Sequence, residues 1–247
     1  MDRGSQKISY GYLRQGLPDS TVKMIVWDGS ESPPHRLAKP PRVPSFLHGW
    51  LGHGNRRVLT HLLHTDQPHT VIELGSWYGR SAQWMASHAH RPERLLCVDV
   101  WSETEIMDQQ QVIRPHHPVR FQGECRSVAD TLQDHPLWET FLVNLWPYRD
   151  RVEAVRLDTL TGLRRIYQQL LSQGKLDQVG LIYIDADHRY EAVCAEITLA
   201  HQLFPEARLV GDDYTAHRPV RRAVTEMADR LGFQVVTDHN CWYFLKK

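Results

Sequence analysis

The chain has 247 residues, which suits one ordinary domain with extensions. Hydrophobic residues make up 41% and charged residues 23% of the chain, values that exclude a wholly disordered or low-complexity protein. Lys plus Arg and Asp plus Glu both number 29, so the formal net charge is zero and a polyanionic partner such as nucleic acid is not expected.

The same sequence lacks the signals of membrane insertion and secretion. No apolar run approaches the roughly 18 residues that a membrane span needs, and the polar N-terminus has no apolar core of a secretory signal. The four cysteines are scattered without metal-binding spacing, which is typical of reduced structural cysteines. We therefore expect a cytoplasmic protein that binds no membrane.

The first 55 residues differ from the rest of the chain. Residues 30–46 contain five prolines, and no hydrophobic period is sustained around them. We expect residues 1–55 to be an irregular extension with one strand at Thr21–Trp27, acting as a substrate lid or as an arm of a homo-oligomer. A helix is predicted from Asn55 to about His64.

From Thr70 onward, short apolar strands alternate with amphipathic helices. The expected strands cover 70–74, 94–100, 152–158, 181–185 and 207–213, the expected helices cover 81–89, 160–174, 190–204 and 219–232, and a final hairpin covers 233–237 and 241–245. Residues 101–138 are polar and poorly periodic, so we expect an insertion there. The alternation predicts an α/β fold: a Rossmann-like, doubly wound, mostly parallel seven-stranded sheet with a C-terminal antiparallel hairpin.

A glycine turn follows the first strand of this sheet. Gly75 and Gly79 flank Ser76-Trp77-Tyr78, a spacing that differs from the GxGxxG of dinucleotide-binding proteins. Asp99 ends the next strand, where a carboxylate can accept both hydroxyls of a ribose. Asp158 follows the third strand and is a weaker candidate for the adenine region. A plain strand-to-helix turn and a solvated strand-end carboxylate are the alternatives.

Acidic residues follow the two strands on the other side of the predicted site. Asp185 ends one strand, and Asp212 and Asp213 end its neighbour, so the three carboxylates are expected to converge. Such a group requires a cation or raised pKa values, and oxygen ligands suit Mg²⁺ or another divalent ion. The alternative is that each aspartate only caps the turn after it. His188 lies at the mouth of the same site and could act as a base.

The residues of these segments resemble the class I S-adenosylmethionine-dependent methyltransferases. VIELGSWYGRS is similar to the first motif of that family, CVDVW to its ribose-binding motif, and YIDADHRYEAV with GDDY to the metal-dependent small-molecule O-methyltransferases. That group includes catechol O-methyltransferase and the sugar O-methyltransferases of macrolide and aminocoumarin biosynthesis. The resemblance covers roughly residues 55–247, and it implies a domain over 56–247 with the insertion at 101–138.

The resemblance implies two cofactors and a set of site residues. S-adenosylmethionine would be bound by Glu73, Gly75, Ser76, Tyr78, Gly79, Ser81, Asp99, Asp158 and Asp185, and Mg²⁺ or another divalent cation by Asp185, Asp212 and Asp213. His188 and Asp185 would be catalytic. His188 stands where the catechol enzymes have a lysine base, so Asp185 and Asp187 remain alternatives for the base.

The expected reaction is methylation of a hydroxyl on a small molecule such as a sugar, a phenol or another natural product. Its donor would supply an activated methyl group, and the protein would align donor and acceptor. Two alternatives remain at this point. One is a metal-independent methyltransferase, and the other is a hydroxylase-associated or dinucleotide-dependent enzyme on the same fold.

Overall fold

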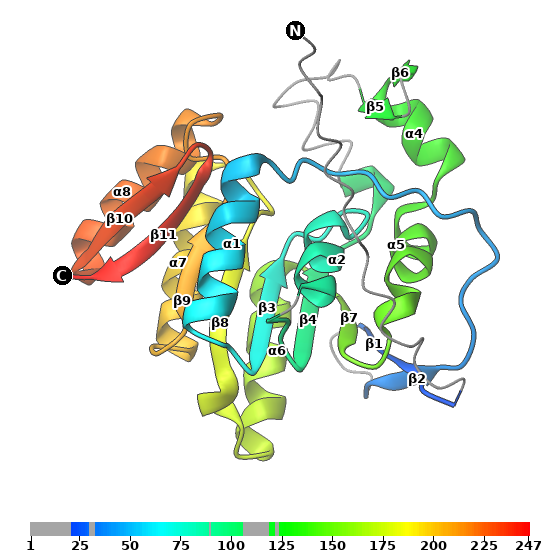
Figure 1. Cartoon of the computed structure of the whole chain (residues 1–247), viewed down its shortest axis with the longest axis horizontal. Helices are drawn as coiled ribbons and strands as arrows, with labels where there is room; N and C mark the ends of the chain where they lie inside the picture. The colour runs from blue at the N-terminus through cyan, green and yellow to red at the C-terminus, as the bar shows by residue number, and fades with distance from the viewer. Residues whose placement is uncertain (1–20, 30–32, 89, 106–118, 122–123) are drawn as a thin grey trace, which may run out of the picture.

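A computed structural model describes residues 21–29, 33–88, 90–105, 119–121 and 124–247. A single large sheet crosses the molecule, with helices on both faces (Figure 1). Its strands are β1 Met24–Asp28, β2 His35–Leu37, β3 Thr70–Leu74, β4 Arg94–Asp99, β7 Val152–Arg156, β8 Val179–Ile184, β9 Arg208–Gly211, β10 Phe233–Asp238 and β11 Cys241–Lys246. The helices are α1 His53–Thr65, α2 Arg80–Ser87, α4 Val128–Asp134, α5 Leu137–Leu145, α6 Thr159–Ser172, α7 Tyr190–Leu203 and α8 Arg218–Leu231.

The order of the strands confirms the predicted doubly wound α/β fold. The sheet runs β10-β11-β9-β8-β3-β4-β7-β1-β2, and every neighbouring pair from β9 to β1 is parallel. β2 and β11 each pair antiparallel with their neighbours, and β10 with β11 forms the expected hairpin. The chain moves outward from β3 in both directions, so the edge beyond the ends of β3 and β8 is the switch point where such sheets bind ligands.

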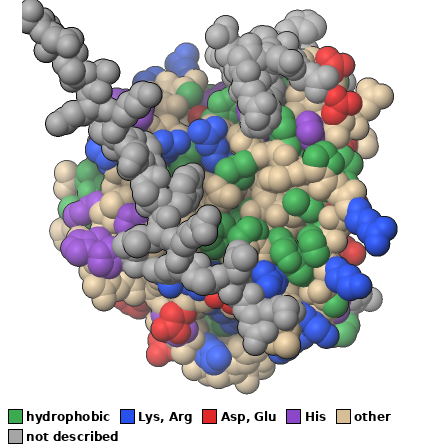
Figure 2. Space-filling view, turned by 45° about the vertical axis from the view of Figure 1, so that its right-hand side comes forward, with side chains coloured by type: hydrophobic (Ala, Val, Ile, Leu, Met, Phe, Trp, Pro, Cys, Tyr) green, Lys and Arg blue, Asp and Glu red, His purple; other side chains and the backbone are tan. Residues whose placement is uncertain are grey.

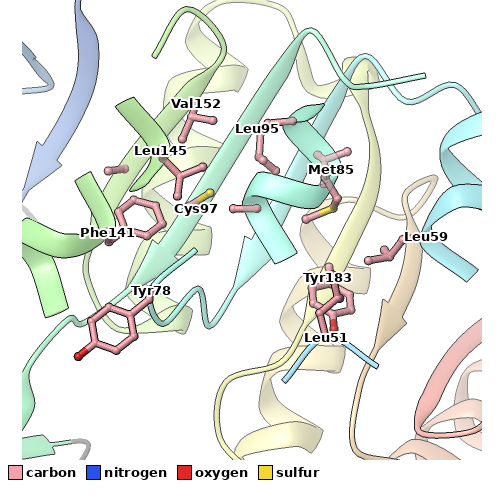
Figure 3. Packing of buried hydrophobic residues seen from close by; sticks show 14 of the residues in the cluster. Leu51, Leu59, Tyr78, Met85, Leu95, Cys97, Phe141, Leu145, Val152 and Tyr183 are labelled. Atoms are coloured by element: carbon pink, nitrogen blue, oxygen red, sulfur yellow. The ribbon is translucent and has the colours of Figure 1, made fainter. Parts of the chain in front are cut away.

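Alternating side chains on the central strands build two cores, one on each face of the sheet. Leu95 and Cys97 of β4 pack with α1, α2 and α5, whereas Leu96 and Val98 pack with α6, α7 and α8. Figure 3 shows part of the first core, in which Cys97, Leu145 and Phe141 lie on the same side of the sheet. Because both faces are covered, polar side chains concentrate at the strand ends.

The N-terminal segment contributes more to the sheet than the sequence predicts. The expected strand near Thr21–Trp27 is present as β1, but β2 was not expected, and the sheet has nine strands rather than seven. The Glu153 carboxylate on β7 joins β1 to β4, since it accepts hydrogen bonds from the Trp27 indole and the Arg94 guanidinium. Residues 1–20 of the predicted arm lie outside the described residues.

The predicted insertion at 101–138 contains regular structure where it is described. A short hairpin of β5 Val119–Phe121 and β6 Glu124–Arg126 precedes α4, and the three lie together at the upper right of Figure 1. Helix α5 begins inside the predicted insertion and packs against α2. Residues 106–118, 122 and 123 of the insertion lie outside the described part.

The surface visible in Figure 2 carries basic and acidic side chains together, with histidines gathered toward one edge. Positive and negative side chains are therefore mixed on this face. Among the described residues, no helix combines the length and the apolar character required to span a membrane.

Candidate active site

A cavity of about 1050 Å³ opens at the carboxyl ends of the central strands. Its wall combines the turn after β3, the ends of β4 and β7, and the loops after β8 and β9. Residues 48–55, which lead from β2 into α1, close another side of the same cavity. The cavity therefore lies at the switch point and is lined by segments from across the chain.

The turn after β3 is shaped by glycine. Gly75 has φ +84°, and a Cβ atom there would lie 2.1 Å from the carbonyl oxygen of Asp185. Gly79 has φ +86°, and a Cβ there would lie 2.1 Å from the Leu145 side chain. The positive φ angles favour glycine at both positions, and at Gly75 the turn also passes against the backbone of the loop after β8.

The Asp99 carboxylate fixes this turn from the end of β4. Its Oδ2 accepts hydrogen bonds from the backbone N–H groups of Ser76 and Trp77, both at 2.9 Å. Its Oδ1 accepts from the N–H of Trp101 at 3.0 Å. Burial raises the pKa of Asp99, while these N–H donors act in the opposite direction. Asp99 lines the cavity, at the place where the sequence predicts the ribose contact.

The predicted cofactor residues divide into two groups. Gly75, Ser76, Ser81, Asp99, Asp158 and Asp185 line the cavity, whereas Glu73, Tyr78 and Gly79 do not. Asp158 also caps α6 by accepting a hydrogen bond from the N–H of Thr161.

Tyr78 and Glu73 support the turn from below instead of facing the cavity. Tyr78 is fully buried, and its hydroxyl donates to the carbonyl of His135 at 2.6 Å (Figure 3). Its side chain therefore points into the core and not toward the cavity that would hold the cofactor. The Glu73 carboxylate accepts a hydrogen bond from the Ser76 hydroxyl at 2.5 Å. Complete burial raises the pKa of Glu73 to about 7.

Carboxylates gather on the opposite wall of the cavity, at the ends of β8 and β9. Burial, followed by the charges of Asp212 and Asp213, raises the pKa of Asp185 well above its ordinary value. Burial and the Asp213 charge raise the pKa of Asp212 to about 6. Buried carboxylates that repel one another favour a bound cation or a shared proton.

The predicted set of Asp185, Asp212 and Asp213 does not meet in one cluster of ligand atoms. Asp212 is held elsewhere, since its Oδ2 accepts from the Asn55 amide at 2.5 Å and its Oδ1 from the N–H of Asp213 at 2.7 Å. Within the part of the chain that the structure describes, the group of possible ligand atoms within 4.8 Å of one another is His188, Asp213 and His217. The hydrogen bond from Asn55 ties the Asp212 side chain to the start of α1.

His188 is paired with a carboxylate. Its Nε2 lies 2.7 Å from Asp213 Oδ2. Burial alone would lower the pKa of His188, but the hydrogen bond and charge of Asp213 raise it above the ordinary value. Burial acts to raise the pKa of Asp213, and the hydrogen bond and charge of His188 lower it overall. The two groups therefore favour each other's charged form, and His188 Nε2 is engaged by Asp213.

Asn55 and His217 are site residues that the sequence analysis missed. Asn55 is buried at the start of α1, and its amide donates to the Tyr183 hydroxyl as well as to Asp212. The sequence carries no signal for this long-range contact. His217 stands four residues after Asp213, a spacing that the GDDYTAH segment displays and that could have marked it.

An aromatic wall completes the cavity on the side of the N-terminal segment. The Trp77 indole donates to His48 Nδ1 at 3.3 Å, and Trp50 packs near both rings, with centroid separations of 4.8 Å from His48 and 5.8 Å from Trp77. Burial and the Arg80 charge lower the pKa of His48 to about 4, so this wall is uncharged at neutral pH. Trp50 is 49% exposed and lines the cavity.

Comparisons with known proteins agree with this arrangement. Residues 72–214, more than half of the chain, match the family model described as a methyltransferase domain. This match confirms the methyltransferase family that the sequence resembles. No curated protein sequence matches the chain significantly.

Solved structures to which the chain is similar have low sequence identity to it. A "putative caffeoyl-CoA O-methyltransferase" from Staphylococcus aureus is 11% identical with a TM-score of 0.51, over 81% of this chain and 86% of that one. An O-methyltransferase from Bacillus cereus in complex with SAH is 18% identical with a TM-score of 0.47, over 78% and 80% of the two chains. TomG, an O-methyltransferase from Streptomyces achromogenes in complex with SAM, is 15% identical with a TM-score of 0.47, over 78% and 79%.

The burial of Glu73 predicts a stability difference that depends on pH. Unfolded Glu73 has an ordinary pKa near 4.5, and folded Glu73 about 7, so between these values the folded chain keeps a proton that the unfolded chain has released. Wild-type stability should therefore fall relative to E73Q as pH rises through this window, by about 3 kcal/mol at most. Urea unfolding of both proteins across the window measures the difference, and a difference that stays constant with pH would contradict the burial argument.

Proposed function

The chain belongs to the methyltransferase-domain family, and on that premise we propose that it transfers a methyl group from S-adenosylmethionine to a hydroxyl oxygen of a small molecule, assisted by a divalent cation. The observation that carries the proposal is the shared cavity: the glycine turn with Asp99 forms one wall, and Asp185, Asp212 and Asp213 form another. A donor held at the first wall would face an acceptor held at the second.

The glycine turn suits the cofactor end of the cavity. Gly75 presents backbone without a side chain, and Asp99 holds the turn rigid through the N–H groups of Ser76 and Trp77. The Asp99 carboxylate faces the cavity, where it would accept hydrogen bonds from the ribose hydroxyls. Asp158 and Thr159, at the end of the neighbouring strand β7, would lie beside the adenine.

The acidic wall suits a divalent cation, because the charges of Asp212 and Asp213 disfavour the anion of Asp185, the charge of Asp213 disfavours that of Asp212, and a cation would offset this repulsion. Asp212 is engaged by Asn55 and Asp213 by His188, so a cation would share these carboxylates with their present partners. When bound, the cation would supply Lewis-acid polarisation of the acceptor hydroxyl. Two hydroxyls on neighbouring carbons, as in a vicinal diol or a catechol, could share it.

Asp185 is the residue best placed to accept the proton of the acceptor hydroxyl. It stands between the two walls, with its backbone against Gly75 and its carboxylate receiving a hydrogen bond from the Tyr183 hydroxyl at 3.4 Å. Of the other candidates for the base, His188 has its Nε2 paired with Asp213, and Asp187 is paired with Arg189. The acceptor would enter past Trp50 and Trp77, so we propose that residues 48–55 take part in acceptor selection.

The cofactor assignment predicts that S-adenosylhomocysteine, the product form of the donor, binds in this cavity. Calorimetry should give a saturable heat with the wild type and a loss of affinity of at least about tenfold in G75A, equal to about 1.4 kcal/mol, because the new Cβ would overlap the Asp185 carbonyl. G52A is the matched control, since Gly52 also lines the cavity but a Cβ there meets nothing within 4 Å. No heat with the wild type, or equal affinity in G75A, would overturn the assignment.

The role of Asp185 predicts a rate loss without a loss of cofactor affinity. With catechol as the acceptor, D185N should transfer methyl groups about a hundredfold more slowly than the wild type, because the proton acceptor is gone while the shape is kept. Mass spectrometry of the methylated product and calorimetry with S-adenosylhomocysteine give the two readouts, with D229N on the surface as control. If D187N loses the rate and D185N keeps it, Asp187 is the base instead.

A further inference from the structure

Three side chains from two loops, the one after β8 and the one between β9 and α8, meet on the acidic wall of the cavity. Asp213 Oδ2 lies 2.7 Å from His188 Nε2, and Asp213 Oδ1 lies 3.9 Å from His217 Nε2. The two imidazole rings are stacked with their centroids 4.2 Å apart. All three side chains line the cavity and are between 18% and 24% exposed, so they are accessible from it.

The backbone holds these side chains in place. Asp213 has φ +64°, its N–H donates to Asp212 Oδ1 at 2.7 Å, and its carbonyl accepts from the N–H of His217 at 3.0 Å. His217 stands directly before α8, and His188 follows β8 in a loop that the Asp187–Arg189 ion pair tightens. The group is therefore preorganised, with its possible ligand atoms within 4.8 Å of one another.

We propose that His188, Asp213 and His217 bind one first-row transition-metal ion that faces the cavity. Two imidazole nitrogens and one carboxylate oxygen suit Mn²⁺, Fe²⁺, Co²⁺, Ni²⁺ or Zn²⁺, whereas Mg²⁺ and Ca²⁺ prefer oxygen ligands throughout. Three protein ligands leave coordination positions open, as in catalytic metal sites. The use of this ion in methyl transfer rests on the proposed function; the binding itself does not.

The surrounding charges favour a cation at this position. Asp185 and Asp212 lie on the same wall of the cavity as Asp213, and Asp212 Oδ1 is 2.7 Å from the backbone nitrogen of Asp213. The guanidinium of Arg189 is engaged by Asp187 and does not neutralise that charge. An ion at the histidines would thus be attracted by carboxylates that are not its ligands, and these would remain available to the acceptor and its proton.

Cobalt titration tests the proposal without any assay of activity. Chelator-treated wild-type protein should bind one Co²⁺, seen as a calorimetric isotherm and as visible d–d absorption bands characteristic of nitrogen ligands. H217A should bind Co²⁺ at least about tenfold more weakly. H53A is the matched control, because His53 lines the same cavity outside the group, and it should bind as the wild type does. A large excess of Mg²⁺ should leave the Co²⁺ bound.

Several results would overturn the proposal. Unchanged Co²⁺ affinity in H217A, or displacement of Co²⁺ by Mg²⁺, would show that the histidines are not ligands. Loss of Co²⁺ binding in D185N but not in H217A would place the ion on the carboxylates alone. Circular dichroism checks whether H217A folds. If it does not, H188Q is a second variant that should weaken Co²⁺ binding in the same way.

Failure of this proposal is distinguishable from failure of the proposed function. If S-adenosylhomocysteine binds and methyl transfer occurs while Co²⁺ binding does not depend on the histidines, the metal assignment is wrong and the methyltransferase proposal stands. If Co²⁺ binds through the histidines and S-adenosylhomocysteine gives no heat, the metal assignment stands and the methyltransferase proposal is wrong.

Discussion

The site depends on the close approach of two backbone segments at the switch point of the sheet. Gly75, at the end of β3, passes so near the carbonyl of Asp185 that a single Cβ atom would overlap it. The Asp185 N–H also donates a hydrogen bond to the Leu74 carbonyl, which joins the two segments, while the Gly75 N–H donates to Val98 and ties the turn to β4. This contact brings the glycine turn and the acidic loop into one cavity, which is the geometry that direct methyl transfer requires.

This arrangement buries several carboxyl groups, and each is stabilised by different neighbours. Glu73 lies wholly inside the fold with a pKa near 7, and it supports the turn through Ser76. Asp99 is stabilised by backbone N–H donors, Asp212 by Asn55, and Asp213 by His188. Asp185 receives only a long hydrogen bond from Tyr183 among its described contacts, and its pKa is raised the furthest of the three on the acidic wall. The zero net charge of the chain therefore conceals a strongly acidic local field.

Much of the fold could be predicted because hydrophobic period and glycine position are local properties. The strand at 70–74 and the final hairpin appear where their patterns indicate, and the strand-end aspartates fall at the expected edge. Helix α5 was missed although Leu137, Phe141 and Leu145 recur at helical spacing, because the polar stretch before it suggested an irregular insertion. β2 has three residues, too few to show a period.

The site was harder to predict, because its details depend on contacts between distant segments. Asn55 reaches Asp212 across 157 positions, and this contact separates the three aspartates that the sequence places together. Tyr78 belongs to the turn by sequence, but the turn rotates its side chain into the core. Asp213 and His217 are close in sequence, but His188 joins them only because the loop after β8 lies beside the loop after β9.

The central claim is that the cofactor at the glycine turn and the cation at the acidic wall bind close together in one shared cavity. Proton NMR relaxation of bound S-adenosylhomocysteine in the presence of Mn²⁺ tests it directly, because a paramagnetic ion relaxes only nearby protons. The account predicts strong broadening of the ligand protons that is lost when Asp213 is replaced by Ala. Binding of both ligands without broadening beyond that caused by Mn²⁺ free in solution would place them in separate sites and contradict the account.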